Sequence, residues 1–287
     1  MQAAIDQEAF RWASVAEATR IVMNIRYSLL TYIYTLFHYA NTEAETVLRA
    51  LAWEFPNDAS VSPYTSGEKD DILTWDQLRG VDNQFMLGPS LLITPVLLPN
   101  VNTVQGIFPG VSEGTIWYDY YTLQALDVKA GENVTLAAPL THINVHVRGG
   151  SILPKQVPGN TTSTTRNNPY ELLVSLDSNG EATGSLYLDD GESLVQNATK
   201  LVQFSYAQNT LKASVTGSYH AAAPLTNITI AGVKSLPTGM NLTIAGQDCD
   251  TGVVSLVQGA NVLTVTGLDA FTTKGAWEGD LNLAFTF

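Results

Sequence analysis

The clearest hydrophobic pattern of the chain lies in its first sixty residues. Between Ile21 and Ala40 the apolar side chains recur three or four positions apart, which predicts an α-helix with one buried face. Ser14 and Glu17 have the spacing of a capping box, in which each side chain satisfies an unpaired backbone N–H at the start of a helix. We therefore expect this helix to begin near Val15.

The run LRALAWEF, residues 48–55, follows a second such pair, Thr42 and Glu45, and ends before Pro56. Its length and its nearly continuous apolar character predict a short strand in a sheet that is covered on both faces. Such a strand needs neighbours, which the residues before Ser14 do not supply. We interpret residues 1–80 as the end of an α/β barrel. The alternative is a self-contained α+β protein whose helix packs on a downstream β-sandwich.

Residues 81–157 are predicted to form a β-sandwich. The stretch QFMLGPSLLITPVLL, residues 84–98, is uncharged and is interrupted by Gly-Pro, which predicts two short buried strands. Four strand-length pieces bounded by Gly, Pro or Asn follow: GIFP, TIWYDYYT, NVTLAAPL and INVHVRGGSILP. Before this region, residues 57–80 read as a polar connection, in which Trp75 to Arg79 can form a short helix.

Residues 158–287 are predicted to form a second, distal β-sandwich. Residues 158–169, PGNTTSTTRNNP, contain no apolar residue except proline and are predicted to be a linker or a long loop. The segments beyond it, such as LVQFSYA and DLNLAFTF, alternate apolar with polar residues, as half-exposed antiparallel strands do. The predicted fold class is therefore mixed: the C-terminal remnant of a (β/α)8 barrel, a helix plus the last strand, followed by two antiparallel β-sandwich domains.

The charge of the chain narrows the classes of partner. Lys plus Arg number 14 and Asp plus Glu 27, which gives a formal net charge of -13. The electrostatic field of this negative charge repels polyphosphates, so we do not expect nucleic acids or anionic membrane surfaces as partners. Neutral ligands such as sugars are compatible with it. No apolar run approaches the ~20 residues of a membrane span.

Five Asn-X-Ser/Thr sequons and the low charged fraction of 14% indicate a secreted or cell-wall glycoprotein. The first twenty residues are not a signal peptide, so we expect a signal on preceding sequence. The single cysteine, Cys249, excludes an internal disulfide and is expected to be inert beside two aspartates. The candidate glycosylation sites are Asn133, Asn160, Asn197, Asn227 and Asn241.

Two pairs of residues are candidates for metal or catalytic groups. Asp189 and Asp190 are adjacent, and adjacent strand residues point to opposite faces, so we expect a turn or surface role, with calcium binding as the alternative. His142 and His146 alternate with valine and isoleucine, which favours a strand that keeps them about 13 Å apart. A shared metal is therefore not expected, and we predict histidines that face solvent or an interface. No metal or cofactor is predicted.

Aromatic residues cluster around Asp119. Trp117, Tyr118, Tyr120 and Tyr121 can form a platform on which a pyranose ring stacks, and Trp117 and Tyr118 are our candidates for that role. The same residues equally fit alternating core and edge positions of a strand, which is the simpler interpretation.

Glu54 and Asp58 bracket the C-terminal end of the predicted barrel strand, where such barrels place their chemistry. We expect a structural role for both. Ser-His-Asp, phosphate-loop and dinucleotide-binding motifs were not found.

Several long strings resemble one enzyme family. IRYSLLTYIYTLFHYANTEAETVLRALAWEFP, DNQFMLGPSLLITPVL, GIFPG with WYDYYT, VHVRGGSILP and LYLDDGES are similar, in this order, to the C-terminal half of glycoside hydrolase family 31, and most of all to fungal α-glucosidases. The similarity extends over roughly residues 5–195. Thr31 stands where many members have proline.

The resemblance implies a barrel whose last helix and strand are seen here, followed by proximal and distal C-terminal β-domains. It also implies a retaining mechanism with two aspartates, a nucleophile and an acid/base. In the family these aspartates lie before the first residue of this sequence, and no position here matches their motifs. We therefore predict that the chain alone is inactive and that its partners are the N-terminal catalytic portion and, through the complete enzyme, α-glucosidic oligosaccharides such as malto-oligosaccharides.

Two further hypotheses remain open. The chain can be a non-catalytic carbohydrate-binding module, or a structural subunit that completes the barrel of another polypeptide. In either the barrel or the assembly interpretation, residues 1–60 expose apolar surface, so we expect them to be loose, prone to aggregation or docked on a partner.

Overall fold

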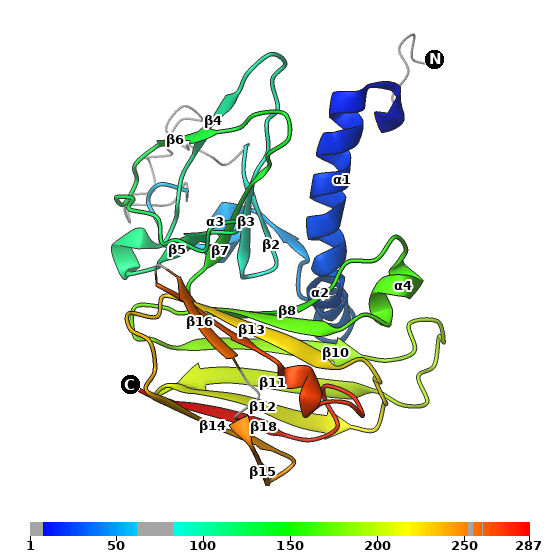
Figure 1. Cartoon of the computed structure of the whole chain (residues 1–287). Helices are drawn as coiled ribbons and strands as arrows, with labels where there is room; N and C mark the ends of the chain where they lie inside the picture. Colours follow the sequence, from blue (N-terminus) through cyan, green and yellow to red (C-terminus); the bar gives the residue numbers. More distant parts are fainter. Residues whose placement is uncertain (1–7, 62–82, 252–254, 260) are drawn as a thin grey trace.

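The structure is a computed structural model, and it describes residues 8–61, 83–251, 255–259 and 261–287. The chain begins with helices and continues into β-sheets, the largest of which packs against α2 through β8 and β10 (Figure 1). This is a mostly β-sheet fold with few helices, which confirms the coarse part of the predicted fold class. The N-terminal helices are η1 (Ala9–Arg11), α1 (Ala13–Ser28), α2 (Leu30–Glu43) and α3 (Leu51–Glu54).

The predicted long helix is present, but its start and its continuity differ from the prediction. It begins after Trp12, whose side chain makes no capping bond, so Ser14 is not the cap. At Leu29, with φ -97° and ψ 6°, α1 ends and α2 begins. The hydroxyl of Thr31 then donates a 2.9 Å hydrogen bond to the carbonyl of Pro154. The break between α1 and α2 therefore lies beside the residue whose side chain bonds to the large sheet.

Residues 48–55 do not form the predicted strand. Only β1 (Leu48–Arg49) is extended, and it pairs antiparallel with β2 (Phe85–Leu87). Because β2 belongs to this chain, the prediction that the segment has lost its neighbouring strands is wrong for these two residues.

Residues 51–54 form the single helical turn α3 instead. Leu51 is 0% exposed and Phe55 is 5% exposed, whereas Trp53 between them is 70% exposed. A spacing of four residues places Leu51 and Phe55 on one face of a helix. The strand prediction failed because it counted Trp53 as a core residue.

The smaller of the two main sheets contains the two strands predicted within residues 84–98, which are joined by a turn at Gly88-Pro89. Every pair in it is antiparallel. A separate two-stranded sheet pairs β4 (Thr103–Gly106) with β6 (Val134–Ala137), so the predicted strand GIFP contributes only its glycine. The order in this sheet is β1, β2, β3 (Leu91–Thr94), β7 (Asn144–Arg148) and β5 (Trp117–Asp119).

The larger sheet has eleven strands, and its two halves enclose one apolar core. Most neighbours are antiparallel, but β8 pairs parallel with β10, and β9 pairs parallel with β13. The order is β15 (Gln247–Cys249), β14 (Gly239–Ile244), β18 (Leu281–Thr286), β12 (Thr210–Gly217), β11 (Lys200–Ala207), β10 (Ala182–Leu188), β8 (Ser151–Gln156), β9 (Tyr170–Ser175), β13 (Leu225–Ala231), β17 (Val262–Thr266) and β16 (Ser255–Gly259).

The chain passes from the smaller sheet to the larger one at Gly149 and Gly150. Gly150 has φ +89°, a conformation that residues with a side chain rarely adopt, and a Cβ on Gly149 would lie 2.9 Å from the carbonyl oxygen of Leu176. The piece INVHVRGGSILP therefore supplies one strand to each sheet, and β8 is part of the larger sheet although it precedes residue 157.

The stretch predicted as a linker, residues 158–169, contains a short helix, α4 (Thr162–Arg166). The hydroxyl of Thr161 accepts a hydrogen bond from the backbone N–H of Thr164, as an N-cap does, and Thr165 is 1% exposed. The segment is therefore folded against the rest of the molecule. The short helix predicted near residues 75–79 lies outside the described residues.

The two sheets and α2 share one buried cluster. Leu29 and Leu36 of the helical segment pack with Val147 of the smaller sheet and with Leu153 and Leu173 of the larger sheet. A surface helix that buries one face in this way fixes the relative position of the sheets. The region where α2 meets both sheets is therefore a closely packed junction of the fold.

Candidate functional site

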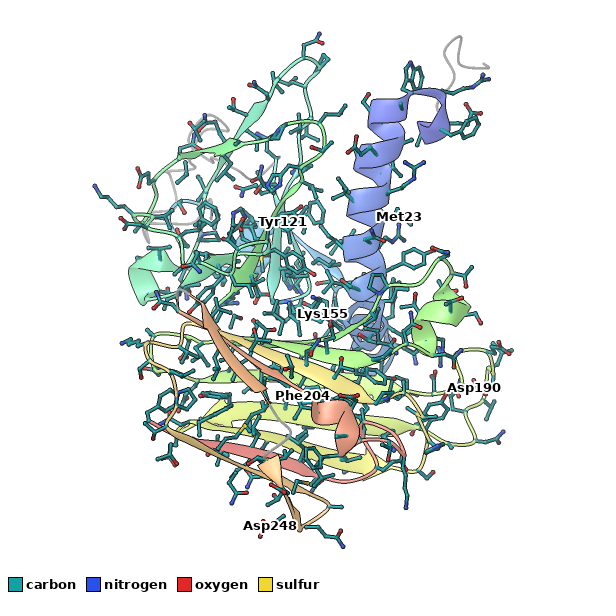
Figure 2. All side chains as sticks on the ribbon, viewed as in Figure 1. Met23, Tyr121, Lys155, Asp190, Phe204 and Asp248 are labelled. Atoms are coloured by element: carbon teal, nitrogen blue, oxygen red, sulfur yellow. The ribbon has the colours of Figure 1, made fainter. Side chains whose placement is uncertain are left out.

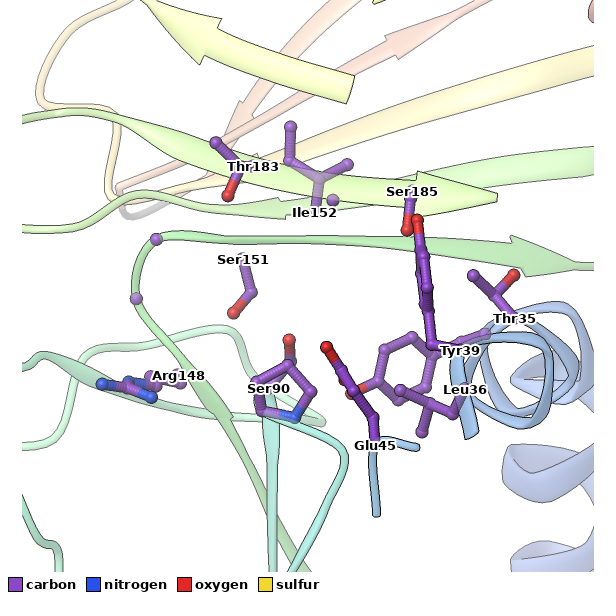
Figure 3. A pocket seen from close by; sticks show the side chains of 15 residues that line it. Thr35, Leu36, Tyr39, Glu45, Ser90, Arg148, Ser151, Ile152, Thr183 and Ser185 are labelled. Atoms are coloured by element: carbon purple, nitrogen blue, oxygen red, sulfur yellow. The ribbon is translucent and has the colours of Figure 1, made fainter. Parts of the chain in front are cut away.

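A cavity of about 410 Å³ lies at this junction, between α2, the β2–β3 turn, the β7–β8 turn and β10 (Figure 3). Small-molecule sites typically have volumes of about 300–1,000 Å³. Hydroxyl groups and glycine backbone form much of the lining. The hydroxyl-bearing residues are Tyr32, Thr35, Tyr39, Ser90, Ser151, Thr183 and Ser185.

The alternation of β10 explains why two of these hydroxyls face α2. Leu186 points into the core of the larger sheet, so Thr183 and Ser185 point to the opposite face of the strand. A Cβ on Gly184 would lie 2.1 Å from the carbonyl oxygen of Ile152, so glycine is required for β10 to approach β8 this closely.

Sequence reasoning missed these residues. Ser151, Thr183 and Ser185 are small polar residues in alternating strands, a pattern that normally indicates a face exposed to water. The available signal was the glycine pair before Ser151, which marks a turn between strands. Only the packing of α2 across this face turns the hydroxyls into the wall of a cavity.

The charged groups near the cavity are paired with one another. Arg49 lies between two carboxylates, at 2.7 Å from Glu45 and 2.8 Å from Glu54. Arg148 lies 2.8 Å from Glu54, and its guanidinium stands 4.5 Å from the centroid of the Phe55 ring. Glu54 thus bridges two arginines, which is the structural role expected for it.

Of the fifteen residues that line the cavity, Glu45 is the only acid. Retaining glycoside hydrolysis needs two carboxyl groups about 5–5.5 Å apart, one nucleophile and one acid/base. This lining does not supply such a pair. Its chemistry is that of hydrogen bonding to a polar ligand.

Asp58, the other acid predicted near the end of the barrel strand, stabilises a loop. Burial alone would raise the pKa of its carboxyl, but hydrogen bonds from Ser60 and from the backbone N–H of Gly110 lower it. A carboxylate held in this way is a fixed structural acceptor.

Asp189 and Asp190 separate as the strand geometry predicted, but only Asp190 is at the surface (Figure 2). Asp190 accepts hydrogen bonds from the backbone and hydroxyl of Ser193 and closes a turn. Asp189 is 3% exposed and accepts hydrogen bonds of 2.8 and 2.9 Å from the hydroxyl of Tyr34. Burial and this carboxylate raise the pKa of Tyr34 to about 12, so the hydroxyl keeps its proton and ties α2 to β10.

His146 was predicted to face solvent or an interface, and this prediction is wrong. It is 2% exposed on β7, where its ring meets the ring of Phe108 edge-on at 4.8 Å. Its Nδ1 is buried without a hydrogen-bond partner among the described residues. Burial lowers the pKa of His146 to about 4, against the attraction of Asp119. His142 lies nearer the surface, with its ring 4.5 Å from that of Tyr121.

The buried His146 predicts a loss of stability in acid. Its pKa in the folded state lies below the ordinary value of about 6.5, so between pH 6.5 and 4 the unfolded chain binds the proton more tightly. The free energy of unfolding should therefore fall by about 2–3 kcal/mol as the pH drops through this window. Urea denaturation of the wild type and of His146→Leu at pH 7 and pH 4.5 checks this. Equal pH dependence in both proteins would contradict the assignment.

Trp117 and Tyr118 do not present their rings to solvent. They are 1% and 2% exposed, and the indole Nε1–H donates a 2.9 Å hydrogen bond to the carbonyl of Pro109. The hydroxyl of Tyr118 donates to the carbonyl of Leu176 at 2.7 Å. Because a ring that stacks on a sugar must expose one face, this burial argues against the sugar-stacking role and favours the core positions that the sequence also allowed.

Comparison with known proteins identifies the family. Residues 44–153 match the family model described as the glycosyl hydrolase family 31 C-terminal domain. The chain is similar to an α-glucosidase of Aspergillus oryzae, with 48% identity over 277 residues, and to one of Aspergillus niger, with 48% identity over 273 residues. The alignments cover 96% and 95% of this chain. Residues 44–153 of the chain therefore carry the C-terminal domain of glycoside hydrolase family 31.

The chain spans about a quarter of the length of the curated relatives it matches. It covers 26% of each Aspergillus α-glucosidase and 27% of glucoamylase 1 from Schwanniomyces occidentalis, to which it is 46% identical over 282 residues. The similarity thus concerns the C-terminal part of longer enzymes.

The fold of the chain is similar to parts of solved structures. The glucosidase II α subunit in its Tris-bound form superposes with a TM-score of 0.79 at 21% identity, over 99% of this chain and 30% of that one. A family 31 dextranase from Flavobacterium johnsoniae in complex with glucose gives a TM-score of 0.71 at 20% identity, over 99% of this chain and 34% of the dextranase. At this identity the likeness concerns the fold alone.

Two features are absent from the described residues of the chain. No helix there has the length and apolar character needed to cross a membrane. No group of three or more His, Cys, Asp or Glu side chains in that part of the chain is placed to hold a metal ion.

Proposed function

We propose that this chain is the C-terminal portion of a retaining α-glucosidase that releases terminal α-linked glucose from malto-oligosaccharides. The observation that carries the proposal is the 48% identity over 96% of this chain to an α-glucosidase of which it spans only 26%. In this proposal the catalytic aspartates lie on the preceding catalytic portion. α1 and α2 are then the last helix of its barrel, and the sheets are the supporting C-terminal β-domains.

The exposed surface of the N-terminal helices supports a docked catalytic portion. Ala18 and Ser28 are the only buried residues of α1. Large apolar side chains stay exposed here: Phe10 at 75%, Trp12 at 46%, Phe37 at 58% and Trp53 at 70%. Exposed apolar patches of this kind mark interaction surfaces, because burying them against a partner removes apolar area from water.

The proposal predicts that the 287-residue chain alone does not hydrolyse p-nitrophenyl α-glucoside or maltose. Adding the separately produced N-terminal catalytic portion, or joining it to this chain, should restore turnover. The measurement is glucose or nitrophenol release over time at equal molar concentrations. Enzyme-like turnover by the isolated chain, or failure of the joined protein to turn over either substrate, would refute the proposal.

The proposal includes secretion as a glycoprotein, for which the five sequons are the support. Four of the asparagines are exposed, whereas Asn227 lies half-buried on β13 and its side-chain N–H group donates a 3.1 Å hydrogen bond to Glu171. Glycosylation takes place on that nitrogen. We therefore expect glycans at Asn133, Asn160, Asn197 and Asn241 and none at Asn227.

Peptide mass spectrometry of protein secreted from a fungal host, with and without deglycosylation in H₂¹⁸O, reads the occupancy of each site. Full occupancy at Asn227, or an unmodified asparagine at all five sites of secreted protein, would contradict the expectation.

A further inference from the structure

We propose that the cavity between α2 and β10 is a non-catalytic binding site for one neutral, polyhydroxylated sugar unit. Glucose is our choice among such ligands, and this choice rests on the proposed α-glucosidase role. The cavity itself does not depend on that role, because its shape and its polar lining come from the packing of this chain.

Hydroxyl groups converge on the cavity from different elements. The side-chain oxygens of Ser151, Thr183 and Ser185 point into it from β8 and β10, and Ser90 reaches it from the β2–β3 turn (Figure 3). Among the described residues, no hydrogen bond to another protein group engages the hydroxyls of Ser151, Thr183 or Ser185. Three donors and acceptors from two strands are thus available to the same ligand.

The pairing properties of these groups fit a sugar. A serine or threonine hydroxyl both donates and accepts, as each sugar hydroxyl does, so the two sets can bond in either direction. The carboxylate of Glu45, which is paired with Arg49 at 2.7 Å, also lines the cavity and keeps acceptor capacity, and the ring of Tyr39 lines it as well (Figure 3). A mostly apolar pocket selects apolar ligands. In this cavity a hydrocarbon ligand would leave the hydroxyl groups of the lining without hydrogen-bond partners, which is unfavourable.

Charge argues against an anionic ligand. Arg148 is the only cationic residue in the lining, and its guanidinium is held by Glu54 at 2.8 Å. The net charge of the chain is -13, which disfavours an anion, and Glu45 is paired with Arg49 at 2.7 Å. A phosphate or a carboxylate would therefore meet no unpaired cation in this lining. A neutral sugar therefore fits better than a sugar phosphate.

The test is titration of the 287-residue chain with glucose and maltose, followed by calorimetry and by saturation-transfer NMR. We expect saturable binding with one site per chain. Thr183→Val keeps the shape of the side chain and removes its hydroxyl, which should weaken binding about five-fold, the effect of one lost hydrogen bond. Ser185→Ala should weaken it by a similar factor, and glucose 6-phosphate should bind more weakly than glucose.

The matched control is Ser205→Ala. Ser205 pairs with Thr183 across β10 and β11 on the same face of the sheet, is exposed, and does not line the cavity. The Ser205→Ala variant should bind glucose as the wild type does. The midpoints of thermal unfolding should show that all three variants are folded. If Thr183→Val does not fold, Ser185→Ala carries the same test.

Absence of saturable glucose or maltose binding would overturn the proposal, as would equal binding by the wild type and both cavity variants. A loss of binding in Ser205→Ala equal to that in Thr183→Val would also overturn it, by placing the ligand elsewhere on the sheet. All of these readouts measure binding and none measures turnover, so they are distinguishable from failure of the proposed α-glucosidase function.

Discussion

Replacement of Trp117 with alanine is expected to lower the free energy of unfolding by about 3–5 kcal/mol, the usual cost of removing a large aromatic side chain from a core. Trp117 is 1% exposed, and its ring packs against those of Phe55 and Phe108 with centroids 6.1 and 6.2 Å away. The variant also leaves the carbonyl of Pro109 without its 2.9 Å hydrogen bond. Urea denaturation followed by circular dichroism measures the change.

Trp53→Ala is the matched control for this experiment. Trp53 is 70% exposed, so its removal should change the stability of the isolated chain by no more than about 0.5 kcal/mol. If Trp117→Ala costs as little as Trp53→Ala, then Trp117 is not part of the core that joins α3 to β5, and its availability for sugar stacking must be reconsidered.

Glu54→Gln is the second change with a large expected effect, a destabilisation of about 3 kcal/mol. The carboxylate lies 2.8 Å from both Arg49 and Arg148, and its side chain is only 13% exposed. Removing one partner of a buried ion pair leaves uncompensated charge, which typically costs about 3–5 kcal/mol. Since Arg148 is 29% exposed and can gain water, we expect the lower end of this range.

Glu113→Gln provides the comparison, because Glu113 is exposed in the short helix η2 (Val111–Glu113) and should be nearly neutral. Both variants are measured by urea denaturation at low and at high salt. A loss below 1 kcal/mol for Glu54→Gln would show that the two arginines are solvated when the bridge is absent. The ion pairs of Glu54 with the two arginines would then orient α3 relative to β7 without adding to the free energy of unfolding.

Local patterns predicted several elements correctly. The spacing of apolar residues between Ile21 and Ala40 predicted the helical region, and the uncharged run broken by Gly88-Pro89 predicted β2 and β3. Period-two alternation predicted the strands of the larger sheet. These predictions succeed because periodicity indicates which face of an element is buried. A face is buried whenever some other element packs on it, so the prediction does not require knowing which element that is.

The errors arose where the same pattern fits two structures. LRALAWEF is apolar enough for a buried strand, yet Leu51 and Phe55 also lie one helical turn apart, and Trp53 is exposed. His146 sits in an alternating strand, but both faces of β7 are covered, so alternation no longer indicates exposure. In each case the missing information was what packs on the second face.

The sequence alone is sufficient for the resemblance to glycoside hydrolase family 31 and for the mostly β character of the fold. It is not sufficient for the cavity, because that depends on which face of β10 receives α2 and on how closely β8 approaches Gly184. Periodicity is a property of a few neighbouring residues, whereas the cavity is formed by residues up to 153 positions apart, from Tyr32 to Ser185, which only long-range packing brings together.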